Sequence, residues 1–155
     1  MNEMSKAAGE GAAGAITYRG AVQVWQCDHM GHMNVMWYVG KFDEGTWNFF
    51  ASLGITGAYM RDRERGMAAV QQNITYRREL MAGDIVTVRS RLLEMRERVI
   101  RFEHVMYVGD TDEIAARCEC TGVHIDRKTR KATPFPNDIL ERGRRVLATP
   151  EPAEA

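Results

Sequence analysis

The sequence predicts an α+β fold in which one antiparallel sheet of about five strands curls around one long central helix. The first observation is a strongly apolar segment, residues 35–53, with a helix signal at each end. The second is that the hydrophobic period changes from about 3.6 residues to about 2 after this segment. The third is that the links between the later strands are too short for parallel crossovers, which need about a dozen residues.

The chain of 155 residues is the length of one domain, which we expect to span residues 16–147. Apolar residues make up 45% and charged residues 27%, as in a globular domain, so disorder throughout is excluded. We expect residues 1–15, which are rich in Ala and Gly, to be flexible. The same holds for residues 148–155, which contain two prolines.

The long helix is expected from Val35 to Leu53. Asn34 is a good N-cap and Gly54 a good residue to end the helix. Apolar residues occupy most of its circumference, so we expect it to be buried nearly all round. Two internal glycines, Gly40 and Gly45, are explained if a strand or another subunit approaches closely there.

The remaining elements follow from alternation and turn residues. A first strand is expected from Thr17 to Trp25, with Val22 and Val24 on one face. Four later strands are expected over residues 67–78, 84–94, 98–108 and 114–125. Ala82-Gly83 and Gly109-Asp110 are predicted hairpin turns, and a short helix is expected from Asn137.

Charge and cysteine usage exclude several function classes. Twenty-one basic and twenty-one acidic residues cancel, so no overall field attracts nucleic acid or an anionic membrane. The sequence contains no apolar run of the roughly 20 residues that span a bilayer, and its start lacks the apolar centre of a signal peptide. Three cysteines cannot all pair, so we expect free thiols and a cytoplasmic location.

The segment between the first strand and the helix carries the candidate chemistry. Asp28 is followed by Gly31, which permits a tight turn, and by Asn34, which caps the helix. The first-turn amides, beginning at Val35, lack intrahelical partners and carry the positive end of the helix dipole. Such amides could polarise a carbonyl oxygen while the carboxylate, directly or through water, attacks its carbon.

These residues give the chain a resemblance to a known family. Asp28, Gly31, His32, Asn34, Tyr38 and Glu44, at these spacings, resemble the pattern of the 4-hydroxybenzoyl-CoA thioesterase family of hotdog proteins. The resemblance implies a hotdog fold and hydrolysis of an acyl-CoA thioester. It extends from about residue 17 to about residue 133.

The resemblance also implies roles for single residues. Asp28 matches the catalytic carboxylate, as nucleophile or general base, and the amide of Val35 matches the group that polarises the thioester carbonyl. Gly31 and Asn34 match positions that shape the loop and cap the helix, and Tyr38 matches an aromatic position at the site or dimer interface. In the founding branch the positions of His32 and Asn34 are apolar or aromatic, so an aromatic acyl preference does not follow.

Several candidates have two interpretations. His32 either takes part in the site or holds the loop by hydrogen bonds, and with His29 it suggests a metal site that lacks further ligands. Glu44 is a reserve catalytic carboxylate, because a carboxylate on a buried helix should be paired, partly wet or functional. Candidates to bind the phosphates of coenzyme A, or to form a solvated rim, are Arg77, Arg78, Lys128, Arg130 and Lys131.

The function that the sequence predicts is therefore that of an acyl-CoA thioesterase. Its partners would be the acyl-CoA and a second copy of the chain, as a homodimer or a dimer of dimers, because an open sheet leaves an edge that needs a partner. Coenzyme A is part of the substrate, and we expect no separate cofactor and no metal. The alternatives are a hotdog dehydratase or hydratase on acyl thioesters and a non-catalytic acyl-CoA-binding module.

Overall fold

The structure is a computed structural model that describes residues 14–148. The expectation of flexible ends therefore falls mainly on residues 1–13 and 149–155, which lie outside the described residues. The elements in chain order are β1 (Ala15–Ala21), η1 (Val24–Gln26), α1 (Val35–Ser52), α2 (Gly57–Asp62), β2 (Arg65–Tyr76), β3 (Ile85–Met95), β4 (Val99–Val108), β5 (Ile114–Asp126) and α3 (Asn137–Ala148).

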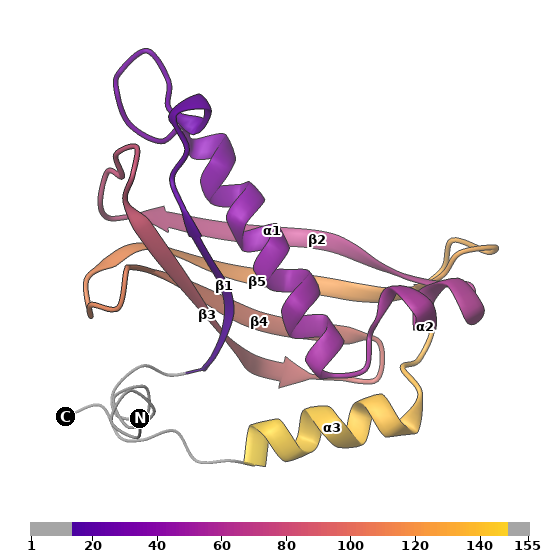
Figure 1. Cartoon of the computed structure of the whole chain (residues 1–155). Coiled ribbons are helices and arrows are strands. Elements are labelled where there is room, and N and C mark those ends of the chain that lie inside the picture. Colours follow the sequence, from indigo (N-terminus) through magenta and orange to yellow (C-terminus); the bar gives the residue numbers. More distant parts are fainter. Residues whose placement is uncertain (1–13, 149–155) are drawn as a thin grey trace.

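The strands form one five-stranded sheet in the order β1-β3-β4-β5-β2, and each neighbouring pair is antiparallel. Helix α1 lies across one face of this curved sheet, and α3 lies near one end of it (Figure 1). The predicted α+β architecture of about five strands and one long helix is confirmed.

One predicted hairpin is wrong. Gly109-Asp110 joins β4 to β5, which pair directly, as expected. The turn at Ala82-Gly83 does not join neighbours, because β2 pairs with β5 and β3 pairs with β1 and β4. The chain therefore crosses from one edge of the sheet to β3 near the other edge, which a local turn signal does not reveal.

The core follows the alternation of β3 and β4. The inward residues Val86, Val88 and Leu92 of β3 and Ile100, Phe102, His104 and Met106 of β4 are buried. Each strand therefore presents one face to α1, as the period of two predicts. Burial of these apolar side chains is the main stabilising contribution.

The ends of α1 agree with the prediction. The Asn34 side chain accepts a hydrogen bond from the amide of Met36, and Leu53 is the C-cap. Gly54 follows with a φ of +88°, a backbone conformation that L side chains rarely adopt. The signal that starts the helix and the signal that ends it thus both act at the predicted positions.

The expectation that α1 is buried nearly all round is wrong for the single chain. Phe42, Phe49 and Phe50 are buried, but Val35, Met36 and Trp47 are exposed. The sheet covers only one side of the helix. The exposed apolar residues must therefore either face solvent or contact another molecule.

Two further elements differ from expectation. The first strand ends at Ala21, and Val24 and Trp25 belong to the short 3-10 helix η1. Val22 is buried whereas Val24 is 78% exposed, so the two do not share one face. Helix α2, which precedes Arg65, is not among the elements predicted from the sequence, and the side chain of its N-cap Thr56 accepts a hydrogen bond from the amide of Tyr59.

Buried hydrogen bonds fix α1 against the sheet. The hydroxyl of Thr46 donates to the carbonyl of Phe42 (3.0 Å), so it accepts from Nε2–H of His104 (2.8 Å). Nδ1 of His104 then accepts from Ser90 (2.5 Å), whose oxygen lies 2.6 Å from that of Thr17. This chain of polar groups links β1, β3 and β4 to the middle of α1.

Gly45 allows the helix to come this close. A Cβ at this position would lie 3.1 Å from Oγ1 of Thr17, 3.4 Å from Val88 and 3.6 Å from the ring of His104. The predicted close approach of a strand is therefore confirmed at Gly45. At Gly40 a Cβ would meet, among residues 14–148, only the Trp37 ring, at 3.6 Å, so no strand in that range explains this glycine.

Candidate functional site

The loop before α1 is a small closed unit. Cys27 and Met33 form an antiparallel bridge, and the amide of Gly31 donates to the carbonyl of Asp28 (3.0 Å). Gly31 has a φ of +90°, as its predicted role in a tight turn requires. The amide of Asn34 donates to the carbonyl of Gln26 (2.9 Å), which ties the end of the loop to η1.

Both carboxylate oxygens of Asp28 accept hydrogen bonds. Oδ1 accepts from the amide of Met30 (2.9 Å) and Oδ2 accepts from Nδ2 of Asn34 (3.1 Å). Because Oδ1 of Asn34 also accepts from the amide of Met36 (3.0 Å), one side chain joins the carboxylate to the start of α1. The predicted juxtaposition of the acid and the helix start is therefore present in the structure.

The hydrogen bonds around Asp28 favour its charged form. The Met30 amide, and next the Asn34 side chain, lower the pKa of Asp28 below its ordinary value, and partial burial opposes them. His32 and His29 lower this pKa further, by smaller amounts. Asp28 is thus ionised at neutral pH, as a nucleophile or general base must be.

The start of α1 offers fewer free amides than expected. The Met36 amide is capped by the Asn34 side chain, and the Trp37 amide donates to the Asn34 carbonyl (2.9 Å). The amide of Val35 has no acceptor among residues 14–148. Val35 is therefore the first-turn donor that remains available to polarise a bound carbonyl oxygen.

His32 lies beside Glu79, a second acid near the Asp28 loop. Its Nε2 is 3.4 Å from Oε1 of Glu79, in the segment between β2 and β3. Glu79 is far from the loop in sequence, so no local pattern indicates this contact. His32 is largely buried and Glu79 is exposed, which leaves the pair accessible from the Glu79 side.

Tyr38 lies in the core of this chain rather than at its surface. It is buried, and its hydroxyl donates to the carbonyl of Arg78 (2.8 Å). Its ring packs edge-on against that of Tyr76, 5.2 Å away. Burial is the main cause that raises the pKa of Tyr38, to about 12, so its hydroxyl stays protonated and keeps its hydrogen bond to Arg78.

The predicted phosphate-binding residues are placed in two groups. Arg77 and Arg78 are exposed after β2, and the Arg78 guanidinium is bound to the carboxylate of Glu113. Lys128 forms an ion pair with Glu64 (2.8 Å) near the turn after β5. Arg77 and Arg78 follow the end of β2 and directly precede Glu79, the contact of His32, whereas Lys128 lies in another loop.

The helix carboxylate that faces a groove is Asp43, not Glu44. Glu44 is exposed and makes no hydrogen bond or ion pair within residues 14–148. Its expected place on a buried surface is therefore wrong. Asp43 lines a groove between α1, β2 and β5, with an empty volume of about 420 Å³, part of which is open solvent.

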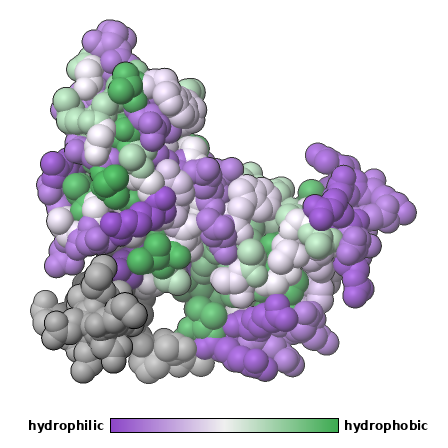
Figure 2. All heavy atoms as spheres, in the orientation of Figure 1, coloured by the Kyte–Doolittle hydropathy of each residue, from purple (hydrophilic) through white to green (hydrophobic). Residues whose placement is uncertain are grey.

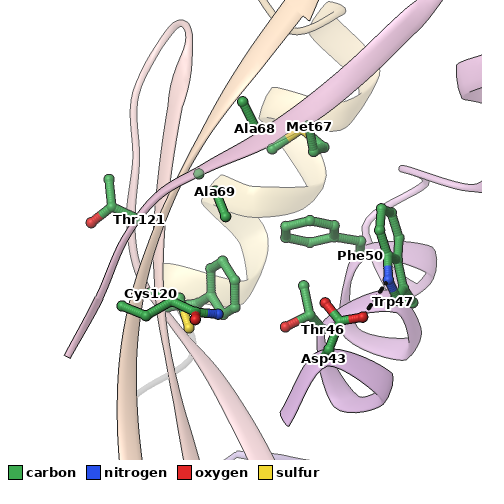
Figure 3. A pocket seen from close by; sticks show the side chains of 12 residues that line it. Asp43, Thr46, Trp47, Phe50, Met67, Ala68, Ala69, Cys120 and Thr121 are labelled. Atoms are coloured by element: carbon green, nitrogen blue, oxygen red, sulfur yellow. Dashed lines mark hydrogen bonds between the residues drawn. The ribbon is translucent and has the colours of Figure 1, made fainter. Parts of the chain in front are cut away.

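The groove has an apolar floor and a polar rim. Residues from α1 form one wall and those from β2 the opposite wall, with Cys120 of β5 below (Figure 3). The lining residues are Asp43, Thr46, Trp47, Phe50, Met67, Ala68, Ala69, Gln72, Phe102, Cys120, Thr121 and Gly122. Asp28 is not among them, so within one chain the acid of the loop and this groove are separate.

The helical spacing contains the signal for this groove. Thr46 and Trp47 follow Asp43 by three and four residues, and Phe50 follows them by four and three, so the four residues lie on one stripe of α1. Glu44 is one residue further, about 100° around the helix, and so points elsewhere. Residue spacing alone distinguishes the two acids, but it does not show which stripe the sheet leaves open.

A second exposed apolar surface surrounds the loop. Val24, Trp25, Met30, Val35 and Met36 are all exposed, and the Trp25 ring packs edge-on against Trp37 at 4.9 Å. In the space-filling view, hydrophobic residues appear among hydrophilic ones toward this projecting end (Figure 2). Such a patch is typical of a contact with another molecule.

Other thiol and imidazole side chains are buried in the fold. Cys118 and Cys120 are buried on one face of β5 with their sulfurs 3.3 Å apart. His124 is buried between the Thr133 carbonyl (2.7 Å) and the Tyr59 hydroxyl (2.9 Å). Among residues 14–148, no three side chains of His, Cys, Asp or Glu are grouped as metal ligands. No helix in that range is long and apolar enough to cross a bilayer.

The family comparison gives a match to most of the chain. A family model described as the thioesterase-like superfamily matches residues 22–143, which include both the Asp28 loop and the groove. Among curated proteins, no sequence matches this chain.

Solved structures share the fold at low sequence identity. A Staphylococcus aureus protein whose structure was determined in complex with CoA is 18% identical, with a TM-score of 0.82, over 94% of this chain and 92% of that chain. A DHNA-CoA thioesterase from Staphylococcus aureus is 16% identical, with a TM-score of 0.77, over 84% and 89%. A 1,4-dihydroxy-2-naphthoyl-CoA thioesterase from Synechocystis is 16% identical, with a TM-score of 0.75, over 87% and 98%.

Proposed function

Because the chain belongs to the thioesterase-like superfamily, we propose that it hydrolyses an acyl-CoA thioester to a free acid and coenzyme A. The observation that carries the proposal is the position of Asp28. Its ionised carboxylate is hydrogen-bonded to Asn34, the residue that caps α1. The next residue is Val35, whose amide has no hydrogen-bond acceptor within residues 14–148. A nucleophile or base is thus held beside a donor suited to a carbonyl oxygen.

Asp28 would act in one of two ways. As general base it takes a proton from water, the water oxygen bonds to the acyl carbon, and the carbon–sulfur bond breaks. As nucleophile its own oxygen bonds to that carbon, and water then cleaves the resulting anhydride. In both cases the thiolate of coenzyme A leaves and takes up a proton, so the products are the same acid and the same thiol.

Asn34 and Val35 have separate tasks in this mechanism. The amide of Val35 would donate to the thioester oxygen, on which negative charge develops as the carbonyl is attacked. Loss of one such donor typically costs about 10²–10³ in rate. Asn34 would act as a positioning residue, because its amide group fixes the Asp28 carboxylate while its oxygen caps the Met36 amide.

The active form would be a homodimer. β2 is an edge strand of the sheet, and Val70 and Tyr76 are exposed along it. A long exposed edge strand is a ready surface for pairing with another chain. The exposed patch around Trp25 and Met36 would also be covered by a partner. Within one chain the Asp28 loop and the groove are separate. In the dimer, the Asp28 loop of one copy could lie next to the groove of the other copy.

Coenzyme A would be held by basic side chains, with Arg77 and Arg78 as the preferred candidates. They lie two and one positions before Glu79, which contacts His32 beside the Asp28 loop. Arginine binds phosphate through paired hydrogen bonds. The ion pair between Arg78 and Glu113 would have to open or share the guanidinium for Arg78 to serve.

A second candidate function is supported by His32 and Glu79. A hydratase or dehydratase on acyl thioesters needs a histidine paired with an acid, and these two side chains lie 3.4 Å apart. This reaction adds or removes water across a carbon–carbon bond and releases no thiol. A non-catalytic acyl-CoA-binding module would bind the ester and change nothing in it.

The test is a panel of saturated, unsaturated and 3-hydroxyacyl-CoA esters incubated with the purified full chain, with thiol release and acyl composition both measured. We expect stoichiometric release of coenzyme A from at least one saturated ester. Hydration of an unsaturated ester without thiol release would favour the second candidate, and binding without any change would favour the third. Because the chain has three cysteines of its own, a protein-only control is needed for any thiol-reactive dye.

A further inference from the structure

The groove along α1 carries one formal charge. Asp43 is acidic, and the other side chains that line the groove are apolar or neutral polar groups. Among the lining residues there is no Lys, Arg or His to balance a second negative charge. A ligand that enters the groove therefore meets an uncompensated carboxylate.

The Asp43 carboxylate is only partly engaged. Its Oδ2 accepts a hydrogen bond from Nε1 of Trp47 at 3.2 Å, within the helix (Figure 3). Its Oδ1 accepts no hydrogen bond from residues 14–148. One acceptor oxygen thus remains available beside the apolar surface of Phe50 and Phe102.

The groove floor near Asp43 supplies no charge that could compensate this carboxylate. The Cys120 thiol has a raised pKa because of its hydrogen bond with Cys118, its burial, the charge of Cys118 and, as the smallest cause, the negative charge of Asp43. The thiol is therefore neutral and supplies no charge of its own. Gln72 and Thr121 complete the rim with neutral groups.

We propose that Asp43 makes this groove a selective acyl site, which accepts acyl groups with a neutral or hydroxyl-bearing far end and rejects those that end in a carboxylate. A neutral acyl chain excludes water from the apolar floor of the groove, and a hydroxyl at its far end can donate a hydrogen bond to Oδ1 of Asp43. A terminal carboxylate would face a like charge without a counter-ion, which disfavours its binding even though Asp43 is exposed and water weakens the repulsion. The ligand class rests on the proposed function, but the selectivity concerns binding rather than turnover.

The test uses analogues of pentanoyl-CoA, glutaryl-CoA and 5-hydroxypentanoyl-CoA in which a methylene group replaces the thioester sulfur, so that no hydrolysis intervenes. The three acyl groups match in length and differ only at the far end. Binding is measured by calorimetry on the wild type, Asp43→Asn and Glu119→Gln. Glu119 is the matched control, because it follows Cys118 and precedes Cys120 on β5 but is exposed on the opposite face of the sheet.

We expect the wild type and Glu119→Gln to bind the pentanoyl analogue at least about tenfold more tightly than the glutaryl analogue. Asp43→Asn should reduce this ratio to about threefold or less and should weaken binding of the hydroxyl analogue. The Asn side chain can still accept from Trp47, so the helix should remain intact.

Three results would overturn the proposal: equal binding of the pentanoyl and glutaryl analogues by the wild type, an unchanged ratio in Asp43→Asn, or no binding of any of the three. Turnover of ordinary pentanoyl-CoA by the wild type is measured separately. If neither that ester nor any other saturated ester is hydrolysed while the binding ratios follow expectation, the proposed function fails and the selectivity stands. If pentanoyl-CoA is hydrolysed but the ratio of pentanoyl to glutaryl binding is the same in the wild type and Asp43→Asn, the proposed function stands and the selectivity fails.

Discussion

The two flanks of α1 differ in how completely the rest of the chain covers them. The flank toward β1, β3 and β4 is closed, with Gly45 against the strands and the buried His104 bonded to Thr46 and Ser90. The flank toward β2 and β5 is open, and there Asp43 and Trp47 line a groove. One helix thus combines a surface that holds the fold with a surface that is free to bind.

The difference lies in the satisfaction of polar groups. On the closed flank each hydroxyl and ring nitrogen of the Thr17–Ser90–His104–Thr46 chain has a partner, so removing one leaves others buried and unpaired. On the open flank Asp43 keeps an unused acceptor. Substitutions on the closed flank should therefore change stability, whereas substitutions on the open flank should change binding.

The largest effect on stability is expected from Gly45→Leu. The added side chain would overlap Thr17, Val88 and His104. Overpacking typically costs about 1–3 kcal/mol, and because three neighbours are met at once we expect the upper end of that range. The free energy of unfolding from urea titration measures it. Gly40→Leu is the control on the same helix, because a Cβ there meets only the Trp37 ring. Equal losses in both variants would mean that the closed flank is no tighter than the rest of α1.

The next effect is a pH dependence that arises on the closed flank. Burial lowers the pKa of His104 from 6.5 to about 4, so the unfolded chain binds this proton at a higher pH than the folded chain does. The unfolded state thus holds more protons between these two values, and stability falls as the pH drops through that window. Between pH 7 and pH 5 the loss should be about 2 kcal/mol.

The check is urea unfolding at both pH values for the wild type and for His104→Leu. His124, whose pKa is also lowered, mainly by burial, acts in the same direction, so the variant should keep part of the slope. A wild-type stability that stays constant between pH 7 and pH 5 would show that His104 takes up its proton without cost. That result would remove the basis for calling this flank closed.

The smallest effect on stability is expected on the open flank, from Trp47→Phe. This side chain is 45% exposed and its indole N–H donates to Asp43 within the same helix. We expect the free energy of unfolding to change by about 0.5 kcal/mol or less. Loss of several kcal/mol would instead indicate that Trp47 supports the fold, and the contrast between the flanks would then weaken.

Much of the fold follows from local sequence signals. Asn34 and Gly54 define α1 because capping and a left-handed backbone are properties of single residues. The alternation of β3 and β4 likewise records which residues face the core. Strand pairing is not local, which is why the turn at Ala82-Gly83 suggested a hairpin between strands that do not pair.

The candidate site was predictable only in part. The Asp28–Asn34 relationship follows from short spacing in one loop, and the structure places these two side chains 3.1 Å apart. The contact of His32 with Glu79 depends on how distant segments meet, and no spacing reports it. The choice between Asp43 and Glu44 required knowledge of which side of α1 the sheet leaves open, because the apolar pattern indicated burial all round.

The most direct test of Asp28 as the proposed nucleophile or general base is the kcat of Asp28→Asn on the thioester that the wild type hydrolyses best. Asp112→Asn, an exposed acid in the turn between β4 and β5, is the matched control, and an unchanged unfolding midpoint shows that each variant is folded. We predict that kcat falls by about 10²–10⁴-fold in Asp28→Asn and stays at the wild-type value in Asp112→Asn. A folded Asp28→Asn protein that retains the wild-type kcat would contradict the account.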